Sequence, residues 1–198
     1  SDETLTVNGY ATVVVNSLVV GTSTVTANWN GTVAEVSVTA TPDSGVKTWF
    51  EPTARLTLTP PSATNAIGDP HTFTAFLEID SDGDGTYETT PSGEDIDFSL
   101  VGVGILSNET LTVNGYATVV VNSLVVGTST VTAQWSGTVA DVTVIATPDS
   151  GVKTWFEPKA RLTVTPPSAT NAVGDPHTFT AFLEIDSDGN GSYETRPS

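Results

Sequence analysis

The chain has 198 residues, of which 37% are hydrophobic and 15% charged, a composition that can build a packed core and argues against disorder. Its 23 acidic and 6 basic residues give a formal net charge of -17. This charge argues against nucleic acid or an anionic membrane as partner, because both need clustered Lys and Arg. The lack of cysteine excludes disulfides, and no apolar run reaches the roughly 20 residues of a membrane-spanning helix.

The sequence repeats itself at an offset of 106 residues, so that Ser107–Tyr116 restates Ser1–Tyr10. The correspondence continues without a gap to the end of the chain. Over the 92 positions that can be compared (1–92 against 107–198), 12 differ, nearly all mildly. Copies this similar are typical of longer arrays, in which each repeat is one structural unit.

Within each repeat apolar and polar residues alternate, as expected of half-buried strands. In chain order the alternation predicts strands at 55–59, 71–79, 95–100, 116–121, 128–135 and 138–145. Turn-forming Pro, Gly, Asn and Asp residues separate them, and no segment shows a helical period. About seven short strands in each repeat predict an all-β protein made of tandem immunoglobulin-like β-sandwiches.

The boundary between repeats is predicted at a Trp-Phe-Glu-Pro sequence, because proline stops a strand. Residues 53–158 would then form one complete repeat, 1–52 the C-terminal half of another and 159–198 the N-terminal half of the next. Two aromatic rings beside a proline bury enough area to restrict bending, so we expect them between consecutive domains. The predicted joint residues are Trp49, Phe50, Pro52, Trp155, Phe156 and Pro158.

Each half repeat exposes an apolar strand face that it cannot bury alone, and such a face invites pairing. The partners would be neighbouring copies of the repeat, either in the same chain as part of a longer array or head to tail between chains by strand exchange. Joining residue 198 to residue 1 would omit the counterpart of 93–106. Both explanations predict a linear assembly of sandwiches.

The stretch Leu58–Ala75 resembles the opening of bacterial immunoglobulin-like domains of the invasin and intimin kind. Val113–Val119 and Gly127–Ala133 are similar to that family's middle and closing strands, and Val152–Trp155 fits its ending. The resemblance covers the full repeat and all of the chain. It implies an immunoglobulin-like fold and a role as spacer or stalk in extracellular or cell-surface proteins, and it implies no ligand.

Residues 80–88 read Asp-Ser-Asp-Gly-Asp-Gly-Thr-Tyr-Glu. Oxygen ligands at alternate positions on a loop bent by glycine suit a hard cation such as calcium. The predicted ligands are the carboxylates of Asp80, Asp82, Asp84 and Glu88 and the backbone carbonyl of Thr86. The spacing is similar to the start of an EF-hand loop, but the glutamate comes too early and no helical pattern flanks it, so we expect a hairpin loop.

The second copy of this loop places Asp186, Asp188, Asn190, Ser192 and Glu194 at the equivalent positions. Asn190 keeps an oxygen ligand and removes one charge, a change that calcium loops tolerate. Calcium is therefore the predicted cofactor, and an acidic turn that is merely solvated is the alternative.

No other motif points to chemistry. His71 and His177 are the only histidines, too few for a zinc site, and no nucleophile–base pair is visible, so we expect no enzyme. The leading hypothesis is a structural repeat module of an extracellular or cell-surface stalk, surface layer or filament, stiffened by calcium. The alternative is an adhesin or a module that binds carbohydrate or a host protein, in which avidity would come from repetition.

Overall fold

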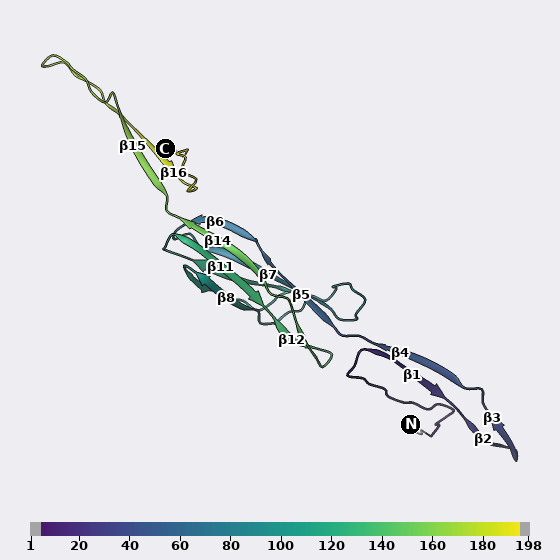
Figure 1. Ribbon diagram of the computed structural model, residues 1–198. Helices are drawn as coiled ribbons and strands as arrows, with labels where there is room; N and C mark the ends of the chain where they lie inside the picture. Colours follow the sequence, from purple (N-terminus) through teal and green to yellow (C-terminus); the bar gives the residue numbers. More distant parts are fainter. Residues whose placement is uncertain (1–4, 195–198) are drawn as a thin grey trace.

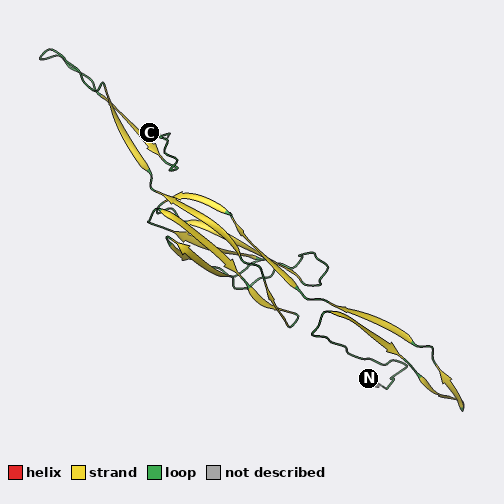
Figure 2. Cartoon of the chain, in the orientation of Figure 1, coloured by secondary structure: helices red, strands yellow, loops and turns green. Residues whose placement is uncertain are grey.

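The computed structural model describes residues 5–194 and is an extended string of three parts (Figure 1). A partial repeat, a β-sandwich and a long hairpin follow one another from the N-terminal to the C-terminal end. Strands and loops make up all of the described residues (Figure 2). No helix long and apolar enough to cross a membrane occurs between residues 5 and 194.

The sandwich consists of two four-stranded sheets. The first has the order β5(Thr53–Thr59)-β7(His71–Asp80)-β10(Tyr116–Asn122)-β9(Ile105–Ser107). The second has the order β6(Ser62–Ala66)-β14(Asp149–Phe156)-β11(Gly127–Gln134)-β8(Asp97–Gly102). All neighbouring strands in these sheets are antiparallel except β6 and β14, which are parallel.

The core lies between the two sheets and follows from the alternation in the sequence. Every second side chain of β7 from Phe73 to Ile79 is buried, as are Val119 and Val121 on β10 and Val131 on β11. Trp135, which follows β11, and Trp155, which pairs with the first residue of β11, belong to the same core. The predicted all-β sandwich fold is thus confirmed.

One predicted strand is wrong in detail. Residues 138–145 do not form a single strand but belong to the hairpin of β12(Ser136–Val139) and β13(Val142–Ile145). The chain reverses at Ala140 and Asp141, whose φ angles of 48° and 64° are left-handed. No Gly or Asn marks this turn, and the alternation continues through it, so the pattern alone reads as one strand.

The N-terminal partial repeat forms two hairpins. Strand β1(Gly21–Ala27) pairs with β4(Asp43–Trp49) in the register that β11 and β14 adopt, and β2(Asn30–Val33) pairs with β3(Val36–Thr39) as β12 does with β13. Residues 11–16, the counterpart of most of β10, are not in a strand. In the sandwich β10 pairs with β7 and β9, and no counterpart of these two strands is among the residues described at this end.

The C-terminal part is a hairpin of β15(Lys159–Thr165) and β16(Thr180–Asp186) with the register of β5 and β7. Residues 168–172, the counterpart of β6, are not in a strand. Leu162, Phe179 and Leu183 are exposed, whereas their counterparts Leu56, Phe73 and Leu77 are buried.

Candidate metal centre and the joint between repeats

The loop after β7 is wound around the carboxylate of Asp80. Asp80 is buried at the end of the strand, and its Oδ1 and Oδ2 atoms accept hydrogen bonds from the Gly83 and Gly85 amides at 2.7 and 3.0 Å. Both glycines have φ angles in the left-handed region, 74° and 89°, which a residue with a Cβ atom rarely adopts. The glycines therefore allow the tight curl that brings the later acidic residues back over Asp80.

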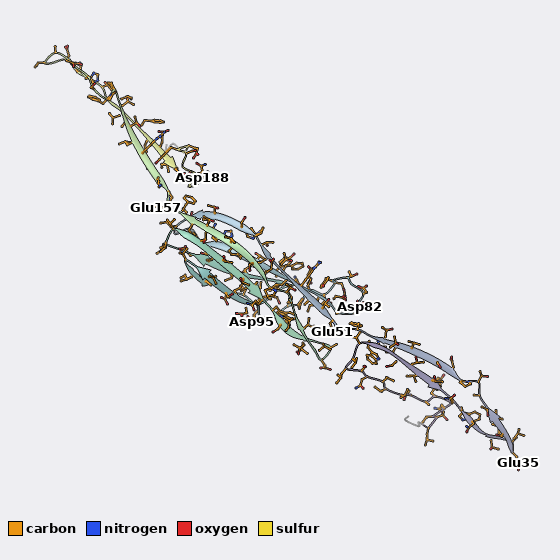
Figure 3. All side chains as sticks on the ribbon, in the orientation of Figure 1. Glu35, Glu51, Asp82, Asp95, Glu157 and Asp188 are labelled. Carbon is orange, nitrogen blue, oxygen red and sulfur yellow. The ribbon has the colours of Figure 1, made fainter. Side chains whose placement is uncertain are left out.

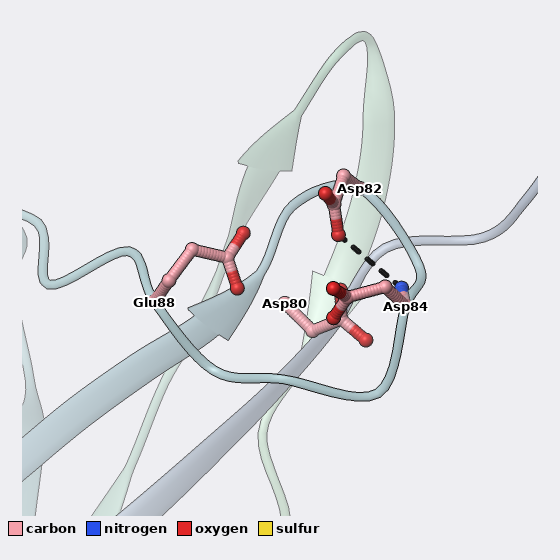
Figure 4. A group of neighbouring side chains, drawn as sticks. All are labelled: Asp80, Asp82, Asp84 and Glu88. Carbon is pink, nitrogen blue, oxygen red and sulfur yellow. Dashed lines mark hydrogen bonds between the residues drawn. The ribbon is translucent and has the colours of Figure 1, made fainter.

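Four carboxylates converge in this loop (Figure 4). Asp80, Asp82, Asp84 and Glu88 each offer an oxygen atom, and these atoms lie within 4.8 Å of one another. Asp82 Oδ1 accepts from the Asp84 amide at 3.2 Å, and Asp84 Oδ1 from the Thr86 amide at 2.7 Å. The Ser81 hydroxyl donates to Glu88 at 3.1 Å and holds its side chain toward the group.

The loop of the C-terminal hairpin has the same construction. Asp186 is buried and accepts from the Gly189 and Gly191 amides at 2.8 and 3.1 Å. Asp186, Asp188 and Glu194 offer oxygen atoms within 4.8 Å of one another. Asn190 keeps the place of Asp84, since its Oδ1 accepts from the Ser192 amide at 2.7 Å.

Both clusters could bind a metal ion. Several carboxylates so close together repel one another, and a divalent cation relieves that repulsion. The donor set consists of oxygen atoms alone, which suits hard cations rather than zinc or copper. The carboxylate ligands predicted from the sequence are thus brought together in both loops. The backbone amides of Thr86 and Ser192, two further predicted ligand residues, donate hydrogen bonds to the Asp84 and Asn190 side chains.

Phenylalanine from one repeat packs on the acidic loop of the next. A Cβ atom built on Gly83 would lie 2.5 Å from Cγ of Phe50, and a Cβ atom on Gly189 would lie equally close to Cγ of Phe156. Phe50 is in the link between β4 and β5, and Phe156 ends β14. The same contact therefore occurs at both joints, and it connects the loop directly to the link between repeats. The glycines of the loop could have suggested that another group packs closely against it, but the sequence does not show that this group is the phenylalanine of the joint.

The prediction that Trp155 lies at the joint is wrong. Trp155 is 1% exposed and belongs to the core of the sandwich, where its indole Nε1 donates to Ser129 Oγ at 2.8 Å. Alternation along β14 explains the result, because Lys153 and Trp155 share the inward face and Phe156 points the other way. Trp49 makes the equivalent bond to Ser23 at 2.8 Å. Of the prolines at the two joints, Pro52 is buried and Pro158 is exposed.

Acidic side chains are spread along the whole described length (Figure 3). Those labelled in the figure are Glu35, Glu51, Asp82, Asp95, Glu157 and Asp188. Among the described residues, two of the glutamates form ion pairs with arginines. These pairs are Arg55–Glu78 and Arg161–Glu184, each with 2.7 Å between Nε and Oε2. The surface therefore carries a field that repels other anionic surfaces.

No protein-family model matches the sequence, and no curated protein matches it. Among solved structures, the chain is similar to the Yersinia pseudotuberculosis adhesin InvE, with a TM-score of 0.36 and 16% sequence identity. The match covers 71% of this chain and 36% of the adhesin chain, so this chain spans well under two thirds of that structure's length.

Proposed function

We propose that this chain is a structural, non-catalytic repeat module of an extracellular or cell-surface filament, stalk or surface layer. The proposal rests on the end-to-end arrangement of near-identical repeats (Figure 1). The same contact of a phenylalanine with a glycine occurs at both joints. The pocket beside β1 and β4 and the one between residues 51–54 and 143–147 are lined by no histidine, lysine or arginine. Length and stiffness are the properties that such a string provides.

Calcium is the cation that we propose for the acidic loops. It accepts several carboxylate and carbonyl oxygens in a flexible geometry, which fits a curled loop better than the strict octahedron of magnesium. Asp80, Asp82, Asp84 and Glu88 would hold it in the first loop. Because Phe50 lies on Gly83 of that loop, fixing the loop also fixes the surface on which the joint packs. Calcium binding would in this way stiffen the string.

The proposed partner is a neighbouring copy of the repeat. The sandwich shows how residues 53–92 and 107–158 dock: β7 pairs with β10, β6 pairs with β14, and the Leu58 amide donates to Asp149 Oδ2 at 2.7 Å. The ends of the described chain carry counterparts of six of its eight sheet strands, three at each end. The other two, β8 and β9, are edge strands, so the inner pairings can form without them.

Two copies would then join when the C-terminal hairpin of one meets the N-terminal partial repeat of the next. This contact buries the apolar faces that each end exposes. Because the two faces are different surfaces, the contact is heterologous and repeats without closing, which produces a line of molecules.

Electron microscopy of the chain at increasing concentration tests the proposal. We expect unbranched filaments one sandwich wide that lengthen with concentration. A control with Phe179→Asp and Leu183→Asp places charges on the exposed face of the C-terminal hairpin and should give single particles. Particles of one chain at all concentrations, with the control indistinguishable, would contradict the proposal.

A further inference from the structure

The core of the sandwich contains a lysine. Lys153 on β14 is 0% exposed, and it makes no ion pair among residues 5–194. A buried ammonium group without a counter-ion is costly, so burial favours the neutral amine. Burial accordingly lowers the pKa of Lys153, an effect that the charge of Asp69 only partly opposes. A neutral amine is a nucleophile.

A side-chain amide lies against this amine. Lys153 Nζ donates to Asn65 Oδ1, across the parallel pair of β14 and β6. Asn65 comes from the second strand of the sandwich and Lys153 from the last, 88 residues apart in the chain. The pair therefore ties the beginning of the domain to its end. Nζ also lies over the Trp155 ring, 5.3 Å from its centroid.

A proton acceptor is next to the pair. The Nε2 atom of His71 is buried and has no hydrogen-bond partner among the described residues. Burial lowers the pKa of His71, and a proton on the nearby Lys153 would lower it further, so the imidazole is neutral at pH 7. A neutral imidazole can accept a proton and return it, which is the role of a general base and acid.

We propose that Lys153 and Asn65 join in an intramolecular isopeptide bond. Nζ attacks Asn65 Cγ, the bond from Cγ to the side-chain amide nitrogen breaks, and ammonia leaves. His71 takes the proton from Nζ and delivers it to the leaving nitrogen. Atoms and charges balance without an oxidant or a cofactor. The product is a neutral amide, which removes the buried amine from the core.

The same pair of residues is repeated at the two ends of the chain. Lys47 lies 5.6 Å from the Trp49 ring, as Lys153 lies beside Trp155, but it is exposed. Asn171, the counterpart of Asn65, lies between β15 and β16 in the C-terminal hairpin and donates to the Pro176 carbonyl at 3.2 Å. Where neighbouring copies complete each other as in the proposed function, on which this step rests, Lys47 of one copy would bond covalently to Asn171 of the next.

Mass spectrometry of the denatured full chain tests the bond in the sandwich. Loss of ammonia lowers the mass by about 17 Da, and a protease digest should contain a branched peptide that joins Lys153 to Asn65. Asn65→Ala and Lys153→Ala should each restore the full mass, whereas the matched control Lys47→Ala should keep the loss. Ammonia is also lost when an Asn-Gly pair such as Asn114-Gly115 cyclises, so the branched peptide is decisive. Full mass with ordinary tryptic cleavage after Lys153 would overturn the proposal, and wild-type protein alone suffices for this outcome.

Gel electrophoresis after boiling in detergent tests the link between copies. We expect a ladder at multiples of 20.5 kDa, lost in Lys47→Ala and in Asn171→Ala. A ladder that persists in both variants would overturn the bond between copies. Filaments that form but fall apart to single chains would overturn it too, while leaving the proposed assembly intact. The branched peptide within the sandwich is independent of either result.

Discussion

The hairpin of β11 and β14 and the hairpin of β1 and β4 have almost the same sequence and the same register, yet one is buried and the other is not. Trp135 is 4% exposed, and its counterpart Trp29 is 45% exposed. Lys153 is enclosed and Lys47 lies in solvent. The two strand pairs thus have the same backbone pairing and differ in the burial of their side chains. Local pairing needs only the hairpin, whereas burial needs the opposite sheet.

The pairings between distant segments show the same division. Strand β10 forms against β7 and β9, but residues 11–16 remain without a strand where such partners are missing. Strand β6 forms only beside β14. Closing a long loop has an entropic cost that only the buried core offsets. The end segments therefore form only their local hairpins, and the strands that need a distant partner do not form in them.

Removing one buried aromatic ring should lower the stability more than any other change proposed. Phe73 is 0% exposed in the core, and its counterpart Phe179 is 56% exposed. Phe73→Ala should lower the free energy of unfolding by about 3–5 kcal/mol, the usual cost of removing a buried phenylalanine. Phe179→Ala should change it by less than about 0.5 kcal/mol in dilute protein. Denaturant unfolding measures both. Similar losses for the two variants would show that the C-terminal hairpin is already packed in the single chain.

Removing calcium should have an intermediate effect. At a free concentration roughly 100 times the dissociation constant, a ligand that binds only the folded state adds about 2.7 kcal/mol. We expect a chelator to lower the melting midpoint and to abolish the difference between the parent and Glu88→Gln. Asp84→Asn, which gives the first loop the residue that the second has at Asn190, should weaken the response without abolishing it. An unchanged midpoint, together with no metal by elemental analysis, would end the calcium hypothesis.

The contact of Phe50 with Gly83 at the joint should contribute least to stability. Phe50→Ala removes the ring that lies on Gly83 and should change the stability of the sandwich by less than about 1 kcal/mol. The joint should bend more freely, because the Phe50 ring no longer packs against the acidic loop. Small-angle scattering should show a shorter average length, and Val46→Ala on exposed β4 is the control. Superimposable profiles of Phe50→Ala and the parent would mean that other contacts hold the joint.

Much of the fold was accessible from the sequence because its signals are local. The alternation in β7 and β14 reports which residues face inward, and the acidic loop is a continuous segment with its own glycines. Trp155 was misplaced because its partner, Ser129, is on another strand. Two other contacts, Phe50 with Gly83 and Lys153 with Asn65, also depend on how distant strands meet. No spacing of residues in the sequence predicts them.

In the proposed assembly, the C-terminal hairpin of one copy docks on the N-terminal partial repeat of the next as the halves of the sandwich do. In β7 and β10, Thr74 is opposite Thr118, and the Leu77 amide bonds to the Gly115 carbonyl. The threonines are therefore a pair without mutual backbone hydrogen bonds, close enough for a disulfide. Their counterparts at the ends are Thr180 and Thr12.

The chain has no cysteine of its own, so Thr12→Cys and Thr180→Cys can be mixed and oxidised gently. The two variants should link to each other far faster than either links to itself. As a control, Thr32→Cys on β2, whose counterpart Thr138 pairs only within its own hairpin, should not link to Thr180→Cys at this rate. Rapid disulfide formation between positions 12 and 180 is the predicted result. Equal slow rates in the mixture, in each variant alone and in the control would contradict the docking of one end on the other.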